Sequence, residues 1–240
     1  GDSFMIETAL QAYPQLPKDH YSIHHAPLTI EMGESPSHIL KQKKASSLAQ
    51  AILSVHAGES QAIISAGNTG AQMAGSLFFL GRIASMERPS IAISFPTLIG
   101  QAILIDAGAN SDSKPDHLLD SAKIGVLYAE KVLHITHPTV GLINNGTESE
   151  KGNLLTKSAF PLLKEQIPNF IGFVETRNLF SGAADIYITD GFTGNIILKT
   201  IEGTASSLFT LLKQEFTHSW KSKIGAWLLK KNFHTIKKRM

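Results

Sequence analysis

The stretch with the clearest chemical potential is residues 61–75, QAIISAGNTGAQMAG. An apolar run ending at Ile63 and Ile64 leads into a Ser-Ala-Gly-Asn-Thr-Gly turn, and apolar residues at helical spacing follow it. Unpaired N–H groups at the start of that helix, together with the positive end of its dipole, favour an anion such as phosphate. The predicted phosphate ligands here are Ser65, Gly67, Asn68, Thr69 and Gly70. The alternative is a plain strand-to-helix turn capped by Thr69.

Three further turns that are rich in Gly, Asn, Asp and Lys also follow apolar runs, at residues 106–114, 144–153 and 190–195. Open α/β sheets bind ligands at the carboxyl ends of their strands, so we expect all four turns to converge on one edge. The candidate catalytic residues are Asp106, Lys114, Asn144 and Asp190, and further candidate phosphate ligands are Asn110, Lys151, Asn153, Thr193, Gly194 and Asn195. Turn formation and helix capping are the alternative roles of these residues.

The elements that must position these turns alternate between helix and strand, which is typical of an α/β protein with a mainly parallel sheet. Expected helices are residues 3–12, 37–57, a segment after Pro115, residues 153–165 and a long segment after Gly194. Expected strands are residues 20–25, the run ending at Ile64, and residues 90–95, 102–106, 139–143, 170–174 and 185–189. We therefore predict a three-layer α/β/α sandwich of Rossmann-like type, with a body at residues 1–206 and a basic amphipathic helical segment at 207–240.

Composition agrees with a globular enzyme. The chain has 240 residues, of which 42% are hydrophobic and 18% charged, and its formal net charge is +2. It has no cysteine, so disulfides, thiolate metal sites and a cysteinyl acyl-enzyme are excluded. The histidines show no metal-ligand spacing, and we expect neither a metal nor an organic cofactor. We expect no secretion signal, and no apolar run approaches the ~20 residues that span a membrane.

The end of the chain is strongly basic. Residues 213–240 hold seven lysines and one arginine against a single acidic residue, Glu215. Aromatic and aliphatic residues recur there at helical intervals, and this pattern favours binding to an anionic membrane surface. The predicted contact residues are Trp220, Trp227, Lys230 and Lys231. Packing of the same stripe on the body or on a dimer partner is the alternative, and nucleic acid is less favoured because no recognition motif accompanies the charge.

Five blocks of sequence, in this order, resemble the phosphate acyltransferase (PlsX) family of bacterial phospholipid synthesis. They are SPSHILKQKKASSLAQA (35–51), QAIISAGNTGAQMAG (61–75), DAGANSDSKPDHL (106–118), GLINNGTESEKGN (141–153) and DGFTGNIILKTIEG (190–203). The resemblance extends to about Ser206. Asn145 stands where the family usually has an apolar residue.

This resemblance implies transfer of a long acyl chain from acyl carrier protein to inorganic phosphate, giving acyl phosphate. It also implies a fold similar to those of isopropylmalate dehydrogenase and phosphotransacetylase, and a homodimer. The enzyme would be cytoplasmic, docked peripherally on the membrane, and would deliver its product to a membrane acyltransferase. Lys41, Lys43 and Lys44 would steer the acidic carrier protein, and a solvated basic surface is the alternative.

The family's initial D-A-M-G-G-D turn and its later G-G-x-x-L-L-G and H-G segments are absent from these 240 residues. We therefore expect a fragment, a truncated product or one piece of a longer chain, with part of the cleft missing. Two alternative functions stay open. One is a related enzyme, a phosphotransacetylase acting on a coenzyme A thioester or, less favoured because no G-x-G-x-x-G is present, a dehydrogenase. The other is a non-catalytic fragment that binds carrier protein or membrane.

Overall fold

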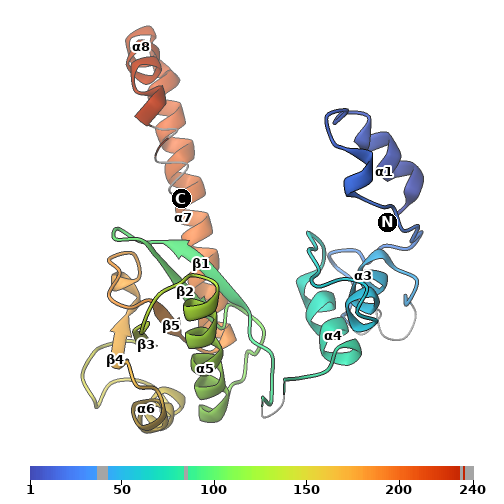
Figure 1. Ribbon diagram of the computed structural model, residues 1–240. Coiled ribbons are helices and arrows are strands. Elements are labelled where there is room, and N and C mark those ends of the chain that lie inside the picture. Colours follow the sequence, from blue (N-terminus) through green and yellow to red (C-terminus); the bar gives the residue numbers. More distant parts are fainter. Residues whose placement is uncertain (37–42, 84–85, 233–234, 236–240) are drawn as a thin grey trace. The chain divides into compact units, whose positions relative to one another are not determined.

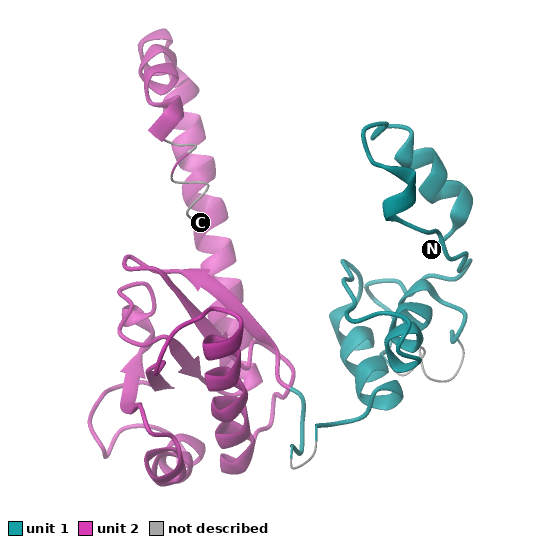
Figure 2. Ribbon diagram, viewed as in Figure 1, with its two compact units in different colours: residues 1–89 teal, residues 90–240 magenta. Residues whose placement is uncertain are grey.

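The structure, a computed structural model, describes residues 1–36, 43–83, 86–232 and 235. It comprises two compact units, Gly1–Pro89 and Ser90–Met240, which Figure 2 distinguishes by colour. The sequence did not predict this boundary. The proposed division at residues 206 and 207 stays a prediction, and it falls inside a continuous helix.

The first unit consists of helices joined by irregular segments (Figure 1). Its elements are α1 (Ser3–Leu10), the 3-10 helix η1 (Lys18–His20), α3 (Ser47–His56) and α4 (Thr69–Phe79). Leu48, Ala49 and Ile52 of α3 pack against Ala71 of α4 to form its small core. Spacing of apolar residues by three and four places these side chains on facing stripes of the two helices.

The predicted strands at residues 20–25 and before the turn at 65 are wrong. A strand is stabilised by a hydrogen-bonded neighbour, and within the described part of this unit the pairing is limited to one isolated bridge, between Leu28 and Ser46. Ile64, expected to end a buried strand, is fully exposed. The two Ile residues at 63 and 64 therefore did not suffice to specify a strand.

Helix α3 is the described part of the helix predicted over residues 37–57. Residues 37–42, including Lys41, lie outside the described residues, and residues 43–45 form a turn. Helix α3 begins at Ser47 because the hydroxyl of Ser46 caps it, accepting the Ala49 N–H at 3.3 Å. Ser46 is fully buried, so this cap also joins the helix to the core.

The second unit is built on a sheet of five strands in the order β1-β2-β5-β3-β4. The strands are β1 (Ala92–Pro96), β2 (Gln101–Ile105), β3 (Val140–Asn144), β4 (Phe170–Glu175) and β5 (Ile186–Ile188). Strands β2 to β5 are mutually parallel, and β1 pairs antiparallel with β2 at the edge. The expected strands of this half of the chain are thus confirmed to within two residues.

Helices cover both faces of this sheet. On one face, α5 (Pro115–Lys131) and α6 (Leu154–Gln166) bury residues such as Leu118 and Leu163 against β2, β3 and β5. On the other face, Ile197 of α7 (Gly191–His218) packs with Leu104 and Tyr187. The short 3-10 helix η2 (Thr176–Asn178) follows β4. The three-layer α/β/α arrangement with a mainly parallel sheet is therefore confirmed.

Helix α7 begins at Gly191, earlier than the start expected after Gly194, and continues well beyond the sheet (Figure 1). It ends at His218, where the Ser219 hydroxyl caps the next helix, α8 (Trp220–Leu228), by accepting the Ser222 N–H. Within the described residues, no helix combines the length and apolar character needed to cross a bilayer.

Candidate active site at the carboxyl edge of the sheet

Three of the four predicted turns lie at the same edge of the sheet. Because β2, β5 and β3 are adjacent and parallel, the turns that follow Ile105, Ile188 and Asn144 leave from one side. The fourth turn, residues 65–70, belongs to the first unit.

Asp106 organises the turn after β2. Its carboxylate is almost fully buried and accepts hydrogen bonds from five N–H groups. Oδ1 accepts from the backbone of Ile91, Gly108 and Ala109 at 2.8–3.1 Å. Oδ2 accepts from the backbone and the side-chain amide of Asn110 at 2.9 and 2.8 Å. The carboxylate therefore fixes the loop, and the catalytic role expected of Asp106 stays a prediction.

The start of α7 lies directly against this loop. The Gly191 N–H donates to the Asn110 carbonyl at 2.8 Å. A Cβ atom added at Gly194 would lie only 1.9 Å from the backbone oxygen of Asp106, and one at Gly191 would lie 2.7 Å from the Asn110 nitrogen. Only glycine permits so close an approach of helix and loop.

Asp190 caps the same helix. Its Oδ1 accepts the Thr193 N–H at 2.9 Å, and its Oδ2 accepts the Thr193 hydroxyl at 2.8 Å. The Gly194 N–H bonds the Asp190 carbonyl at 2.9 Å. Asp190, Thr193 and Gly194 thus have the helix-capping contacts that were the alternative to a role in binding. Asn195 is exposed and lies beside Gly108. An anion site at this helix start stays a prediction.

Asn144 ends β3 in a buried position and ties the next turn together. Its Nδ2 donates to the Gly146 carbonyl at 3.1 Å, and its Oδ1 accepts the Thr156 hydroxyl at 3.4 Å. Asn153 caps α6 by accepting the Thr156 N–H at 2.9 Å. Sequence reasoning missed Thr156. Its place at the third helical position after an N-cap asparagine was the available signal.

Lys114 immediately precedes α5, and Pro115 occupies the first helical position as expected. The backbone N–H of Lys114 donates to Nδ1 of the buried His117 at 3.2 Å, so this imidazole holds the turn. His117 was another missed residue, although the K-P-D-H spacing places it at a position suited to such a bond.

The Lys114 and Lys151 side chains are exposed on the loops that follow β2 and β3. Neither forms an ion pair with any described residue. They place positive charge on two loops at the same edge of the sheet as the backbone frame formed by Asp106, Asn110 and the start of α7. Such a frame with exposed cations at the same edge can hold an anion, which is the chemistry proposed for this edge.

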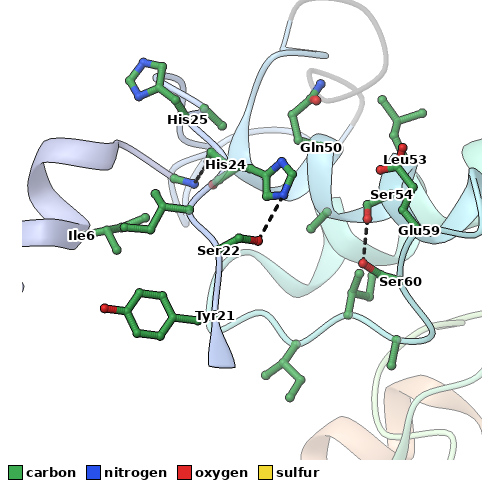
Figure 3. A pocket seen from close by; sticks show the side chains of 18 of the residues that line it. Ile6, Tyr21, Ser22, His24, His25, Gln50, Leu53, Ser54, Glu59 and Ser60 are labelled. Atoms are coloured by element: carbon green, nitrogen blue, oxygen red, sulfur yellow. Dashed lines mark hydrogen bonds between the residues drawn. The ribbon is translucent and has the colours of Figure 1, made fainter. Parts of the chain in front are cut away.

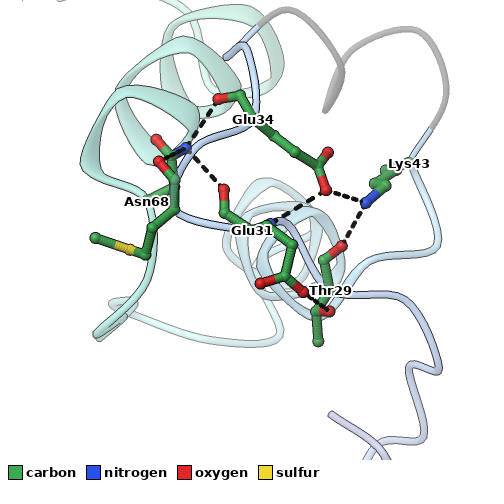
Figure 4. Close-up of polar contacts among 6 residues, drawn as sticks. Thr29, Glu31, Glu34, Lys43 and Asn68 are labelled. Atoms are coloured by element: carbon green, nitrogen blue, oxygen red, sulfur yellow. Dashed lines mark hydrogen bonds and ion pairs between the residues drawn. The ribbon is translucent and has the colours of Figure 1, made fainter.

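In the first unit, Asn68 rather than Thr69 caps α4. Its Oδ1 accepts the Ala71 N–H at 2.9 Å, and its Nδ2 faces the carbonyls of Glu31, Met32 and Glu34 at 3.0–3.2 Å (Figure 4). The Ser65 hydroxyl accepts the Gly67 N–H at 3.2 Å. Among the described residues, the backbone N–H groups of Thr69 and Gly70 have no hydrogen-bond acceptor. Any anion held here would meet these amides and the exposed Thr69 hydroxyl, not the Asn68 side chain.

A pocket of about 1,060 Å³ lies elsewhere in this unit (Figure 3). Ile6, Tyr21, His24, Leu53 and Ile63 are among its lining residues. The two segments misassigned as strands form part of its wall. The pocket therefore lies between helix α3 and segments that belong to no helix or strand.

The described residues that were predicted to contact a carrier protein or a membrane differ in how exposed their side chains are. The Lys43 side chain is partly buried in an ion pair with Glu34, whereas Lys44 is exposed. In the tail, Trp220 and Trp227 are 69% and 72% exposed, and Lys230 and Lys231 are exposed. These four side chains are therefore not covered by the described residues of their own unit.

The fold is similar to that of the EutD phosphotransacetylase of Staphylococcus aureus. The TM-score is 0.53 at 17% sequence identity, with 86% of this chain and 73% of that chain covered. This likeness defines the class of architecture, an α/β protein with a mostly parallel sheet between helices.

The whole chain, residues 1–240, matches the family described as fatty acid synthesis protein. A phosphate acyltransferase of Lysinibacillus sphaericus is 45% identical over 256 residues, covering 98% of this chain and 78% of that protein. One from a Geobacillus strain is 48% identical over 229 residues, covering 95% and 70%. The chain belongs to this family, and the resemblance carried by its five blocks is confirmed. It is an enzyme of fatty acid and phospholipid synthesis that transfers an acyl group to phosphate.

Proposed function

We propose that the acyl donor is a long-chain thioester of acyl carrier protein and that phosphate attacks its carbonyl carbon directly. A phosphate oxygen bonds to that carbon, the carbon–sulfur bond breaks, and the proton lost by phosphate passes to the departing thiolate. The products are acyl phosphate and free carrier protein. This route needs no protein nucleophile, but it needs donors positioned for the anion and for the tetrahedral oxyanion.

The observation that carries the proposal is the interlocked frame at the carboxyl edge of the sheet. The loop at 106–110 and the first turn of α7 are held together by the Asp106 carboxylate and by the close approach at Gly194. Lys114 and Lys151 stand exposed on the neighbouring loops. A backbone held by these contacts, with two cations on loops at the same edge of the sheet, suits a preorganised site for phosphate and developing negative charge.

The turn at 65–70 provides a second set of anion donors in this proposal. The N–H groups of Thr69 and Gly70 open α4, whose N-terminal dipole end favours negative charge. Ser65 and Gly67 shape the turn through their mutual hydrogen bond. Asn68 acts here by fixing the turn, because its side-chain amide is occupied by other protein groups.

The exposed tail supports a peripheral position at the inner face of the cytoplasmic membrane. Trp220 and Trp227 lie on α8 with Lys221 and Lys223, and all four side chains are exposed. Aromatic residues among lysines bind anionic interfaces, which would place the enzyme where a membrane acyltransferase takes up acyl phosphate. A homodimer that covers the same stripe is the competing arrangement.

A comparison of donors tests this proposal. Acyl carrier protein and coenzyme A are loaded with the same long acyl chain, and acyl phosphate is measured at saturating phosphate. Preferred turnover of the carrier-protein thioester supports the proposed donor. Preferred turnover of the coenzyme A thioester would assign a phosphotransacetylase-like reaction, and turnover of neither would support a binding fragment.

A further inference from the structure

Lys43 differs from its neighbour Lys44 in what its side chain contacts. Its Nζ lies 2.5 Å from Glu34 Oε1 and donates to the Thr29 carbonyl at 2.8 Å (Figure 4). The Lys43 and Glu34 side chains are 27% and 20% exposed. Lys44 is exposed and forms no ion pair with a described residue. Lys43 is therefore occupied within the fold, and steering of a carrier protein does not explain its position.

Glu34 connects this lysine to the segment 29–34. The same Oε1 atom that meets Lys43 accepts the Glu31 N–H at 3.3 Å. Lys43 also binds the carbonyl at the start of the segment, Thr29. Lys43 and Glu34 thus connect the two ends of segment 29–34, and this fixes the direction of the carbonyl groups between Glu31 and Glu34.

Those carbonyl groups receive the side chain of Asn68. Its Nδ2 donates toward the carbonyls of Glu31, Met32 and Glu34 at 3.1, 3.2 and 3.0 Å. Two N–H bonds shared among three acceptors hold the amide plane in one orientation. The other end of that amide, Oδ1, caps α4 through Ala71. Asn68 therefore joins segment 29–34 to the start of the helix.

A packing contact supports the same connection. A Cβ atom at Gly70 would lie 2.9 Å from Cγ of Pro36, so the chain just after Glu34 lies against the first turn of α4. The turn at 65–70 is thus held by Asn68 and restricted by Pro36. Both contacts depend on the position of segment 29–36.

We propose that Lys43 and Glu34 are positioning residues for the turn at residues 65–70, which they orient through segment 29–34 and Asn68. This inference rests on the proposed function, in which the N–H groups of Thr69 and Gly70 bind phosphate. The ion pair holds the segment, the segment holds the Asn68 amide, and that amide fixes the helix start and its two open donors. Loss of the pair would lower phosphate affinity without removing a group that touches phosphate.

The test compares Lys43→Met, Glu34→Gln and the reversed pair Lys43→Glu/Glu34→Lys, with Lys44→Met as the matched neighbour. We expect the two single variants to raise the KM for phosphate about three- to tenfold, with little change in the KM for the acyl donor. The reversed pair should recover only part of this loss, because the attraction between the two positions is restored but the bonds to the Thr29 carbonyl and from the Glu31 N–H are not. Lys44→Met should leave the KM for phosphate unchanged.

Hydrogen exchange of the Ala71 amide provides a readout besides activity. Because this N–H is bonded to Asn68, we expect faster exchange in Lys43→Met than in Lys44→Met. Equal exchange in the two variants would overturn the inference, whether or not the chain is active. Absence of phosphate-dependent turnover in the wild-type chain would contradict only the proposed function, because the exchange measurement does not depend on turnover. A rise in the acyl-donor KM that is shared by both lysine variants and disappears at high salt would also overturn it and would restore the steering role.

Discussion

The backbone oxygen of Asp106 and the α-carbon of Gly194 are in direct contact, so that a single methyl group on Gly194 would lie 1.9 Å from that oxygen. This contact joins the loop after β2 to the helix after β5. It holds two of the polar turns of the sequence, D-A-G-A-N and D-G-F-T-G-N, against each other. The geometry of the carboxyl edge depends on it.

Gly194→Ala is therefore expected to displace the start of α7 and to lower the free energy of unfolding by about 1–3 kcal/mol, the usual cost of overpacking. Gly203→Ala is the matched control, since it lies in the same helix with open space around its α-carbon. It should stabilise the protein by about 0.5–1 kcal/mol through helix propensity. Urea denaturation measures both, and equal effects of the two substitutions would contradict the close contact.

Asp106→Asn is expected to lower the free energy of unfolding by about 1–3 kcal/mol, because one carboxylate oxygen becomes an NH₂ group that faces N–H donors. Asp112→Asn, in an exposed part of the same loop, should change it by less than about 0.5 kcal/mol. Denaturant unfolding of the two variants tests this. If Asp106→Asn unfolds at the wild-type denaturant concentration, Asp106 does not organise the loop.

Tyr187 predicts a dependence of stability on alkaline pH. Burial raises the pKa of this phenol above 10.0, its ordinary value, and the nearby Asp185 charge acts in the same direction. Since the folded state keeps the proton to higher pH than the unfolded state, the contribution is present below pH 10 and is lost as the pH rises through the folded-state pKa. The unfolding free energy of the wild type should therefore fall more steeply above pH 10 than that of Tyr187→Phe.

Tyr187→Phe should also be less stable at neutral pH, by about 1–3 kcal/mol. The hydroxyl accepts the Ala184 N–H at 3.1 Å and donates toward the carbonyls of Asn178 and Leu179 at 3.2 Å, so its removal leaves buried partners without a bond. Parallel slopes for wild type and variant between pH 9 and 11 would contradict the raised pKa.

The tail predicts binding to anionic lipid. Sedimentation with vesicles of phosphatidylglycerol should remove the wild-type protein from solution, and phosphatidylcholine vesicles should not. Trp220→Ala/Trp227→Ala should reduce this binding, whereas Phe4→Ala, which changes an aromatic residue of similar exposure in the first unit, should not. Concentration-dependent dimerisation that the tryptophan substitutions abolish, without any vesicle binding, would assign the stripe to a second copy.

The sequence predicted the second unit well because its strands are short apolar runs that end in polar turns, and its helices begin at recognisable caps. Asp190 with Thr193 shows how a cap could also have located the start of α7 at Gly191. The two strands expected in the first unit failed for the opposite reason. Strand formation depends on a hydrogen-bonded partner, which the residues at 20–25 and 61–64 do not specify by themselves.

The site was predicted in its position more reliably than in the roles of its residues. Polar turns after strands indicated the edge of the sheet, but hydrogen-bond partners from distant segments decide whether a side chain is available to a ligand. Asp106 is occupied by donors from residues 91 and 108–110, and Asn68 by carbonyls of residues 31–34. Neither set of partners can be read from the spacing of the motifs.

The most direct test of the central claim is phosphate-dependent formation of acyl phosphate by wild type, Lys114→Met and Lys151→Met. Lys157→Met, at an exposed position on α6, is the control. We predict a higher KM for phosphate in the first two variants and wild-type kinetics in the control. Unchanged kinetics in Lys114→Met and Lys151→Met would contradict an anion site at the carboxyl edge of the sheet.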